Sequence, residues 1–141
     1  MATNAITLNK HDDAGKLVLR ATLAILLLFH GLAKITGGIA PINGMLAGAG
    51  LPGSLGYLVY VGEVIAPLLI LAGVVTRAAA LVVAINMIVA LLLAHTGDLL
   101  AVGPQGGWKL ELQGFYLMTA IAVALLGAGR YSLGGAGGRL N

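Results

Sequence analysis

Six polar side chains interrupt stretches of the sequence that are otherwise almost entirely apolar. They are His30, Lys34, Glu63, His95, Glu111 and Gln113. A charged group in hydrocarbon costs from about 2.5 kcal/mol upward, so each needs a partner, a water-filled cavity or a route to the membrane surface. Imidazole, ammonium and carboxyl groups can exchange protons or bind polar ligands. We therefore take this set as the candidate site.

The first two of these residues are four positions apart. His30 and Lys34 therefore share one face of a helix and could present a proton-active group beside a fixed positive charge. The alternative is that Lys34 extends to the lipid headgroups while His30 bonds a backbone carbonyl. The spacing alone supports both interpretations.

Glu63 is expected about two turns inside a helix, too deep to reach the membrane surface. It must be protonated, paired with Lys34 or His30, or bound to a ligand. Pro67 cannot donate a hydrogen bond to the Glu63 carbonyl four residues earlier, so a kink is predicted there. We favour a functional or pairing role for Glu63 over that of a neutral structural acid.

Taken together, His30, Glu63, His95 and Glu111 make a set of two histidines and two carboxylates that could bind a divalent metal. No pair of these ligands is three or four residues apart, so metal binding is the disfavoured alternative. For His95 alone, a solvated side chain at the membrane surface is the simpler interpretation. Asn86, in mid-helix, is predicted to form a hydrogen bond between helices.

Aromatic and basic residues mark the predicted membrane surfaces. Trp108, Tyr57 and Tyr60 are typical of the headgroup belt, which we favour over a ring-binding pocket. Three arginines are interpreted as cytoplasmic anchors: Arg20, Arg77 and Arg130. These residues are therefore assigned no chemistry.

The composition predicts the elements that must hold these residues. Hydrophobic residues make up 59% of the 141 positions, charged residues 9%, and the mean hydropathy is +0.99, which excludes an ordinary soluble domain. A spanning helix needs roughly 20 apolar residues, so the sequence accommodates four. The predicted spans are 17–35, 56–75, 78–95 and 108–128. The expected fold is an all-α integral membrane four-helix bundle.

Shorter segments complete the predicted organisation. Residues 37–55 are too short to span and predict an interfacial or re-entrant helix, with Gly44 and Gly48 as a face that could dock on the bundle. Residues 1–16 are expected to form a cytoplasmic tail, residues 17–130 the transmembrane domain, and residues 131–141 a glycine-rich cytoplasmic tail.

Charge and cysteine usage restrict partners and chemistry. The absence of cysteine excludes thiol–disulfide exchange and cysteine-ligated iron–sulfur or zinc sites. The net charge of +3 includes no basic cluster typical of nucleic-acid binding, so no nucleic-acid partner is expected. Six Lys and Arg residues fall on one side of the four predicted spans and two on the other, which predicts a bacterial inner-membrane protein with both termini in the cytoplasm.

The order of short motifs resembles the DoxX family of small bacterial and archaeal membrane proteins. The motifs are Arg20, Phe29-His30-Gly31-x-x-Lys34, Gly50-Leu51-Pro52, Gly62-Glu63, Thr76-Arg77-x-Ala79-Ala80, Asn86-Met87, His95, Gly107-Trp108 and Gly127-x-Gly129-Arg130. The resemblance covers nearly all of the chain beyond the N-terminal tail. Lys109 departs from the pattern, because we would expect an acid directly after Trp108.

The resemblance implies a four-helix fold and an association with membrane redox systems, but it transfers no catalytic residue. Our first hypothesis is therefore an accessory subunit of a quinone-linked redox system. In it, His30 and Glu63 bind quinone oxygens or pass protons, Lys34 stabilises the reduced form, and partner subunits supply electrons. The alternative is a non-catalytic scaffold or small-molecule transport element whose buried charges are structural. Contact with lipid is expected in both cases, and self-association is left open.

Overall fold

A computed structural model describes the backbone of residues 2–141 and the side chains of residues 10–141. Within that part of the chain every regular element is a helix, and the one β-bridge is isolated. The elements are α1 (Ala2–Gly37), α2 (Ala40–Gly48), η1 (Gly53–Tyr57), α3 (Leu58–Tyr60), η2 (Val61–Ile65), α4 (Ala66–Ala72), α5 (Thr76–Ala94), η3 (Thr96–Asp98) and α6 (Glu111–Leu126). The all-α prediction is confirmed.

Three helical stretches are long and apolar enough to cross a membrane: Lys10–Gly37, Gly53–Ala72 and Thr76–Ala94. They correspond to the first three predicted spans. The fourth, α6, has 16 residues. At 1.5 Å per residue it is about 24 Å long, shorter than a bilayer core of about 30 Å. The prediction of four spanning helices is therefore supported for three of them.

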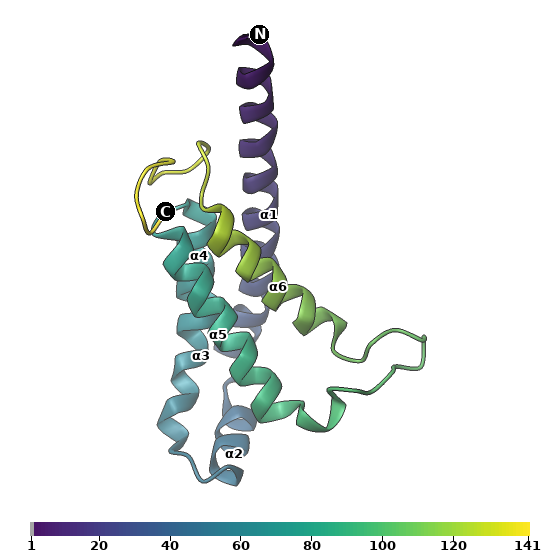
Figure 1. Ribbon diagram of the computed structural model, residues 1–141. Helices are drawn as coiled ribbons and strands as arrows, with labels where there is room; N and C mark the ends of the chain where they lie inside the picture. Colours follow the sequence, from purple (N-terminus) through teal and green to yellow (C-terminus); the bar gives the residue numbers. More distant parts are fainter. Residues whose placement is uncertain (1) are drawn as a thin grey trace.

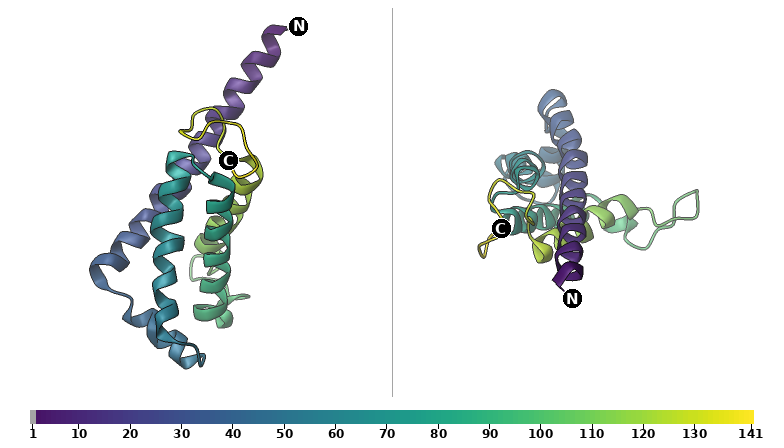
Figure 2. Two further views of the ribbon diagram at one scale, coloured as in Figure 1. Left: turned by 90° about the vertical axis from the view of Figure 1, so that its left-hand side faces the viewer. Right: turned by 90° about the horizontal axis from the view of Figure 1, so that it is seen from above.

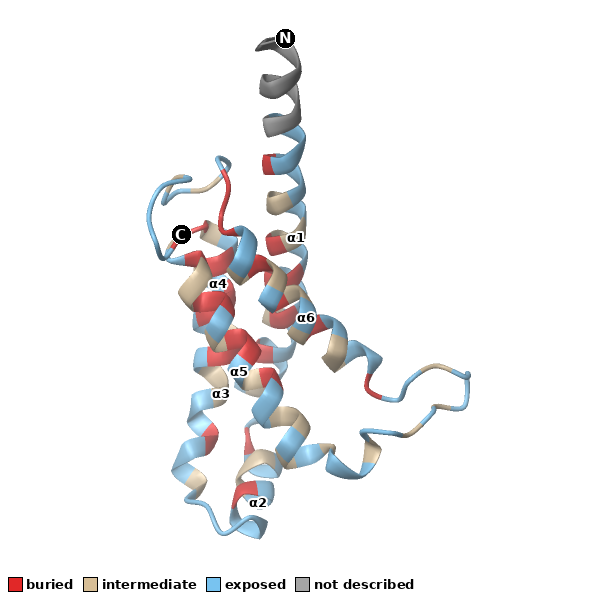
Figure 3. Cartoon of the chain, in the orientation of Figure 1, coloured by how far each residue is buried: buried red, intermediate tan, exposed pale blue. Residues whose placement is uncertain are grey.

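The long helices pack side by side around a small core. In Figures 1 and 2, α4 and α5 run next to each other, α1 crosses them, and α6 leaves the bundle at an angle that carries the loop after α5 away from the other helices. Buried residues concentrate where α1, α4, α5 and α6 meet (Figure 3). The core includes Leu23, Leu27, Ile70, Val83 and Val123. The two ends of the chain lie in the same half of the molecule (Figure 1).

The N-terminal helix is longer than expected. It begins at Ala2, whereas the prediction placed residues 1–16 in a tail and the first span from Leu17. The sequence reasoning relied on apolar periodicity, which residues before Leu17 lack. A helix can continue through polar residues once its apolar part has formed, because each added residue gains one backbone hydrogen bond.

The segment between α1 and α3 contains the short helix α2, at the position predicted for a non-spanning helix. It packs through the buried side chain of Leu46. The predicted docking face of Gly44 and Gly48 is wrong, because open space surrounds both glycines. The close approach occurs instead at Gly56, where an added Cβ would overlap the side-chain oxygen of Asn43.

The helix that carries Glu63 changes its winding just before Pro67. Residues Val61–Ile65 form a π-helical turn, and α4 begins at Ala66 with Pro67 in its first turn. The proline leaves the Glu63 carbonyl without an N–H donor four residues later. A π-helical turn is one of the recognised ways in which a helix accommodates such a break. The structure thus has a π-helical turn where the sequence predicted a kink.

Residues 127–141 are packed over one end of the bundle. Leu133 and Gly134 donate backbone hydrogen bonds to Ala72 and Gly73, at 3.0 and 3.1 Å. The side-chain oxygen of Asn141 accepts hydrogen bonds from the backbone and the hydroxyl of Thr76. The segment predicted as a glycine-rich tail thus covers the end of α4 and the start of α5.

Arg20 joins these elements from the buried face of α1. Its guanidinium donates to the carbonyls of Ile70 and Leu71 at 2.8 and 2.6 Å, and to those of Ala128 and Tyr131. Only 1% of the residue is exposed. Arg20 is therefore not an exposed anchor at the membrane surface: its planar fork of donors binds the end of α4 and the segment after α6.

Candidate functional site

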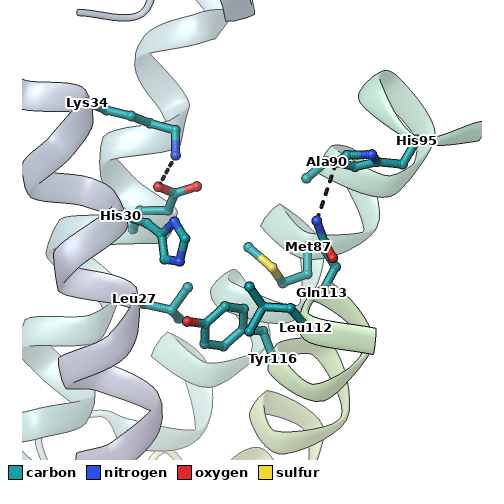
Figure 4. A pocket seen from close by; sticks show the side chains of 10 residues that line it. Leu27, His30, Lys34, Met87, Ala90, His95, Leu112, Gln113 and Tyr116 are labelled. Atoms are coloured by element: carbon teal, nitrogen blue, oxygen red, sulfur yellow. Dashed lines mark hydrogen bonds and ion pairs between the residues drawn. The ribbon is translucent and has the colours of Figure 1, made fainter. Parts of the chain in front are cut away.

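A cavity of about 160 Å³ lies between α1, η2, α5 and α6. Figure 4 shows His30 and Lys34 on one side of it and His95 and Gln113 on the other. The remaining lining residues are Leu27, Glu63, Met87, Ala90, Leu112 and Tyr116. The structure therefore brings together five of the six polar residues singled out in the sequence.

An ion pair forms one polar wall of the cavity. Lys34 Nζ lies 2.5 Å from Glu63 Oε2, and only 6% of Glu63 is exposed. An unpaired carboxylate at such a site would pay a large desolvation penalty, which the neighbouring ammonium offsets. Of the alternatives weighed for Glu63, pairing with Lys34 is the arrangement observed.

Two glycines bring Glu63 to this position. A Cβ at Gly31 would overlap the Glu63 carbonyl oxygen, and a Cβ at Gly62 would overlap the side chain of Asn86. The absence of side chains at these positions lets α1 and α5 approach η2 closely, as small residues do in membrane bundles. The π-helical turn thus lies between two neighbouring helices, with its carboxylate against Lys34.

His30 lies beside Tyr116, one turn of α1 before Lys34. The two rings meet edge to face, with their centroids 5.7 Å apart and their planes at 86°. His30 is exposed on the surface of the chain whereas Tyr116 is buried. Since His30 both lines the cavity and is exposed, it marks a side opening between α1 and α6.

The opposite wall carries two hydrogen-bonding groups, an imidazole and an amide. His95 caps the C-terminal end of α5, and Gln113 lies in the first turn of α6. Gln113 Nε2 and His95 Nε2 are 3.5 Å apart. This contact spans the gap between two helices that diverge, so either side chain can turn toward a molecule in the cavity.

Glu111 does not join the site. It is exposed, and its carboxylate lies against Gly107 instead of the cavity. In residues 10–141 no group of three or more His, Cys, Asp or Glu side chains is placed to hold a metal ion. The structure therefore contradicts the metal set of His30, Glu63, His95 and Glu111, because α6 begins at Glu111 and turns it away from the other three.

The other polar and aromatic predictions have mixed outcomes. Asn86 of α5 packs against Gly62, but the predicted hydrogen bond between helices is not observed: its buried Nδ2 has no hydrogen-bond partner among the described residues. Neither Trp108 nor Tyr57 nor Tyr60 lines the polar cavity. Tyr60 instead donates to the Lys34 carbonyl at 3.0 Å, and Trp108 donates to the Leu99 carbonyl at 2.9 Å.

The aromatic residue that does line the cavity, Tyr116, was missed from the sequence. It lies three residues after Gln113, on the same face of α6. That spacing is the signal that could have identified it. Its ring, together with Leu27, Met87 and Leu112, gives the cavity an apolar floor beneath the polar walls.

Comparison with models of protein families gives a match. The family model named DoxX matches residues 15–96, which is more than half of the chain and includes α2 and the helices that carry His30, Lys34, Glu63 and His95. The match ends before the loop and α6, so it is shorter than the resemblance expected from the motifs. No curated protein and no solved structure matches the chain. The matched residues identify this membrane protein as a member of the DoxX family.

Proposed function

We propose that this protein is an accessory membrane subunit that binds the ring of a quinone in the cavity between α1, η2, α5 and α6. The observation that carries the proposal is the ion pair between the partly exposed Lys34 and the buried Glu63, which faces His95 and Gln113 across a mainly apolar space. A few polar groups on an apolar wall are typical of sites for small amphipathic ligands.

The cavity has a suitable size and opening for such a ring. An apolar cavity of about 150 Å³ can accommodate benzene, and this one measures about 160 Å³. The side opening at His30 would admit a ring from the bilayer while its hydrocarbon tail stays in lipid. Tyr116, Leu27 and Met87 would contact the faces of the ring.

The polar walls suit the charge and proton changes of quinone chemistry. A bound quinone supplies the capacity to take up two electrons and two protons. Lys34 would attract a negative oxygen, and Glu63 would hold Lys34 at the wall of the cavity. His30 and His95 would accept or donate protons near the ring oxygens. We propose that the electrons come from partner subunits, with which this chain assembles in the membrane.

A scaffold role without a ligand is the second candidate, and the same ion pair favours it. Lys34 and Glu63 join α1 to η2. Removing one member of a fully buried ion pair costs about 3–5 kcal/mol because the other charge is left unpaired, and the cost is smaller here because 27% of the Lys34 side chain is exposed. The pair could therefore exist for folding alone. A transport role for the cavity would also use the side opening.

The test compares single and double changes of the pair. Lys34→Met and Glu63→Gln should each destabilise the bundle, whereas the double variant Lys34→Met/Glu63→Leu should recover much of the stability because no charge is left unpaired. Lys10→Met, at an exposed position of α1, is the matched control for the loss of one charge. Binding of a short-tailed benzoquinone is measured in lipid nanodiscs by thermal shift and by equilibrium dialysis.

The two candidates differ in the double variant. If the cavity binds quinone, the wild type and Lys10→Met bind the probe and the folded double variant does not. Equal binding by the double variant, or no binding by the wild type, would reject the quinone site and leave the scaffold role.

We also propose a location and an orientation. The protein would cross the bacterial inner membrane several times, with both termini in the cytoplasm. The unequal distribution of Lys and Arg and the position of both chain ends in one half of the molecule support this topology (Figure 1). The cavity would then lie in the outer half of the bilayer. Association with a second copy of the chain is compatible with this arrangement.

A further inference from the structure

A row of polar side chains leads from the cavity to the loop beyond α5. Gln113 Nε2 lies 3.5 Å from His95 Nε2, His95 Nδ1 lies 3.8 Å from Asp98 Oδ2, and Asp98 Oδ1 lies 2.6 Å from Lys109 Nζ. Asp98 and Lys109 do not line the cavity. His95 thus connects the cavity to the loop: its Nε2 lies beside Gln113 in the cavity wall, and its Nδ1 lies beside the Asp98 carboxylate.

Lys109 keeps the Asp98 carboxylate in its ionised form. The hydrogen bond from Lys109, together with the positive charge of Lys109, lowers the pKa of Asp98 against the opposing effect of desolvation. The backbone N–H of Lys109 also donates to the Ala101 carbonyl at 2.9 Å, which fixes the position of Lys109 in the loop. Asp98 is therefore an anion at neutral pH and lies close to one nitrogen of His95.

A carboxylate beside Nδ1 decides which nitrogen of a neutral histidine carries the proton. At 3.8 Å the contact is electrostatic and longer than a hydrogen bond. A hydrogen on Nδ1 is favoured because it places the positive end of the N–H dipole near the negative charge, and Nε2 is then left with its lone pair. The neighbour of Nε2 is the amide nitrogen of Gln113, which can donate to that lone pair (Figure 4). Both neighbours of His95 thus favour the same tautomer.

We propose that His95 is the proton acceptor of the cavity and that Asp98, held by Lys109, is the positioning residue that keeps its Nε2 unprotonated. This inference rests on the proposed function only for the identity of the ligand. A lone pair at Nε2 selects a ligand that offers a hydroxyl, so this wall would recognise the reduced quinol rather than the oxidised quinone.

The proton transfer balances without any other reactant. The ligand O–H bond breaks, an Nε2–H bond forms, and the resulting imidazolium lies beside the Asp98 carboxylate, which stabilises its charge. The ligand oxygen keeps the bonding electron pair as an anion. The Nδ1 proton can then pass to water, because both His95 and Asp98 are partly exposed.

The first experiment needs no ligand. Isotope-edited NMR of the histidine ring nitrogens, in nanodiscs at a pH where histidine is neutral, distinguishes the two tautomers. We expect the Nδ1–H form at His95 in the wild type and in Asp12→Ala, a change at an exposed aspartate of α1. In Asp98→Ala we expect a loss of that preference. The Nε2–H form in the wild type, or no change in Asp98→Ala, would overturn the inference.

The second experiment separates this inference from the proposed function. A short-tailed quinol and the matching quinone are titrated into the wild type and Asp98→Ala. We expect the affinity for quinol to fall about tenfold in the variant, as for the loss of one good hydrogen bond, while the affinity for quinone stays within about twofold. An equal loss for both forms would overturn the inference.

The outcomes of the two experiments are distinguishable. If the wild type shows the Nδ1–H tautomer but binds neither probe, the proposed quinone function fails while the assignment of His95 stands. If both probes bind but the tautomer is Nε2–H, the inference fails and the quinone site stands.

Discussion

At the scale of single residues, the site depends on two glycines as much as on its charged groups. Gly31 and Gly62 let the neighbouring helices touch the turn that carries Glu63. Without this approach the ammonium of Lys34 could not lie 2.5 Å from the carboxylate. The glycines therefore determine where a charge can be buried.

Gly31→Ala should destabilise the bundle by about 1–3 kcal/mol, the usual cost of forcing an extra carbon into a packed contact. Here the atom met by the new Cβ is a backbone carbonyl, which cannot rotate away. The free energy of unfolding is measured by denaturing-detergent titration in mixed micelles. Gly37→Ala is the control in the same helix, because open space surrounds Gly37. Equal losses in both variants would contradict the packing argument.

Most residues of the site could be predicted from the sequence, but Glu111 was wrongly included and Tyr116 was left out. The spacing of four correctly placed His30 and Lys34 on one face, and the expected depth of Glu63 correctly required a partner. Glu111 was misplaced because only the structure shows that α6 begins there, with its side chain outside the cavity. Tyr116 carries no signal on its own, because only its spacing of three from Gln113 places it on the cavity face of α6.

At the scale of elements, Arg20 connects three parts of the chain that are distant in sequence. It holds carbonyls of the last turn of α4 and of the segment after α6. The end of a helix carries partial negative charge and carbonyls without an intrahelical donor, so a cation that donates several hydrogen bonds is well suited to it. The planar guanidinium donates to four carbonyls at once, which the three donors of a lysine ammonium cannot do.

Arg20→Lys should therefore lower the free energy of unfolding almost as much as Arg20→Met, by about 3 kcal/mol or more, because at least two buried carbonyls lose their donors. The exposed residue Arg139 provides the control, and Arg139→Met should leave stability unchanged within about 0.5 kcal/mol. Thermal unfolding in nanodiscs measures all three variants. Full rescue by lysine would show that charge alone is sufficient.

Helix positions were more predictable than helix ends and docking faces. Runs of apolar residues located α4 with its preceding turns, α5 and the apolar part of α1, since a bilayer demands such runs. The polar start of α1 has no comparable signal. Gly44 and Gly48 have the spacing of a docking face, yet which face of α2 meets the bundle depends on the loops at its two ends.

At the scale of the whole molecule, the number of membrane crossings decides on which side of the membrane the loop after α5 lies. Three stretches are long enough to span, and α6 is shorter but apolar. If α6 also crosses, the chain ends lie on one side of the membrane and the loop after α5 on the other. With both termini in the cytoplasm, as proposed, the row of His95, Asp98 and Lys109 would then lie at the outer surface of the membrane.

Single cysteines test this directly, because the chain has no cysteine of its own. Gly97→Cys and Gly137→Cys are matched positions, each surrounded by open space. In intact cells a membrane-impermeant maleimide should label the cysteine at position 97 and not the one at position 137. Labelling of both, or of neither before lysis, would show that α6 does not cross.

The π-helical turn at Val61–Ile65 has a consequence for comparing relatives of this protein. Such a turn contains one residue more than the α-helical turn it replaces. In a relative that lacked both the extra residue and the proline, the helix would be continuous, and the residue equivalent to Glu63 would be rotated by about 100° relative to position 67. Such a relative would align with this chain through a one-residue gap beside Glu63. The carboxylate of the cavity could thus be gained or lost in evolution by the insertion or deletion of a single codon together with a change at position 67, with no substitution at the glutamate itself.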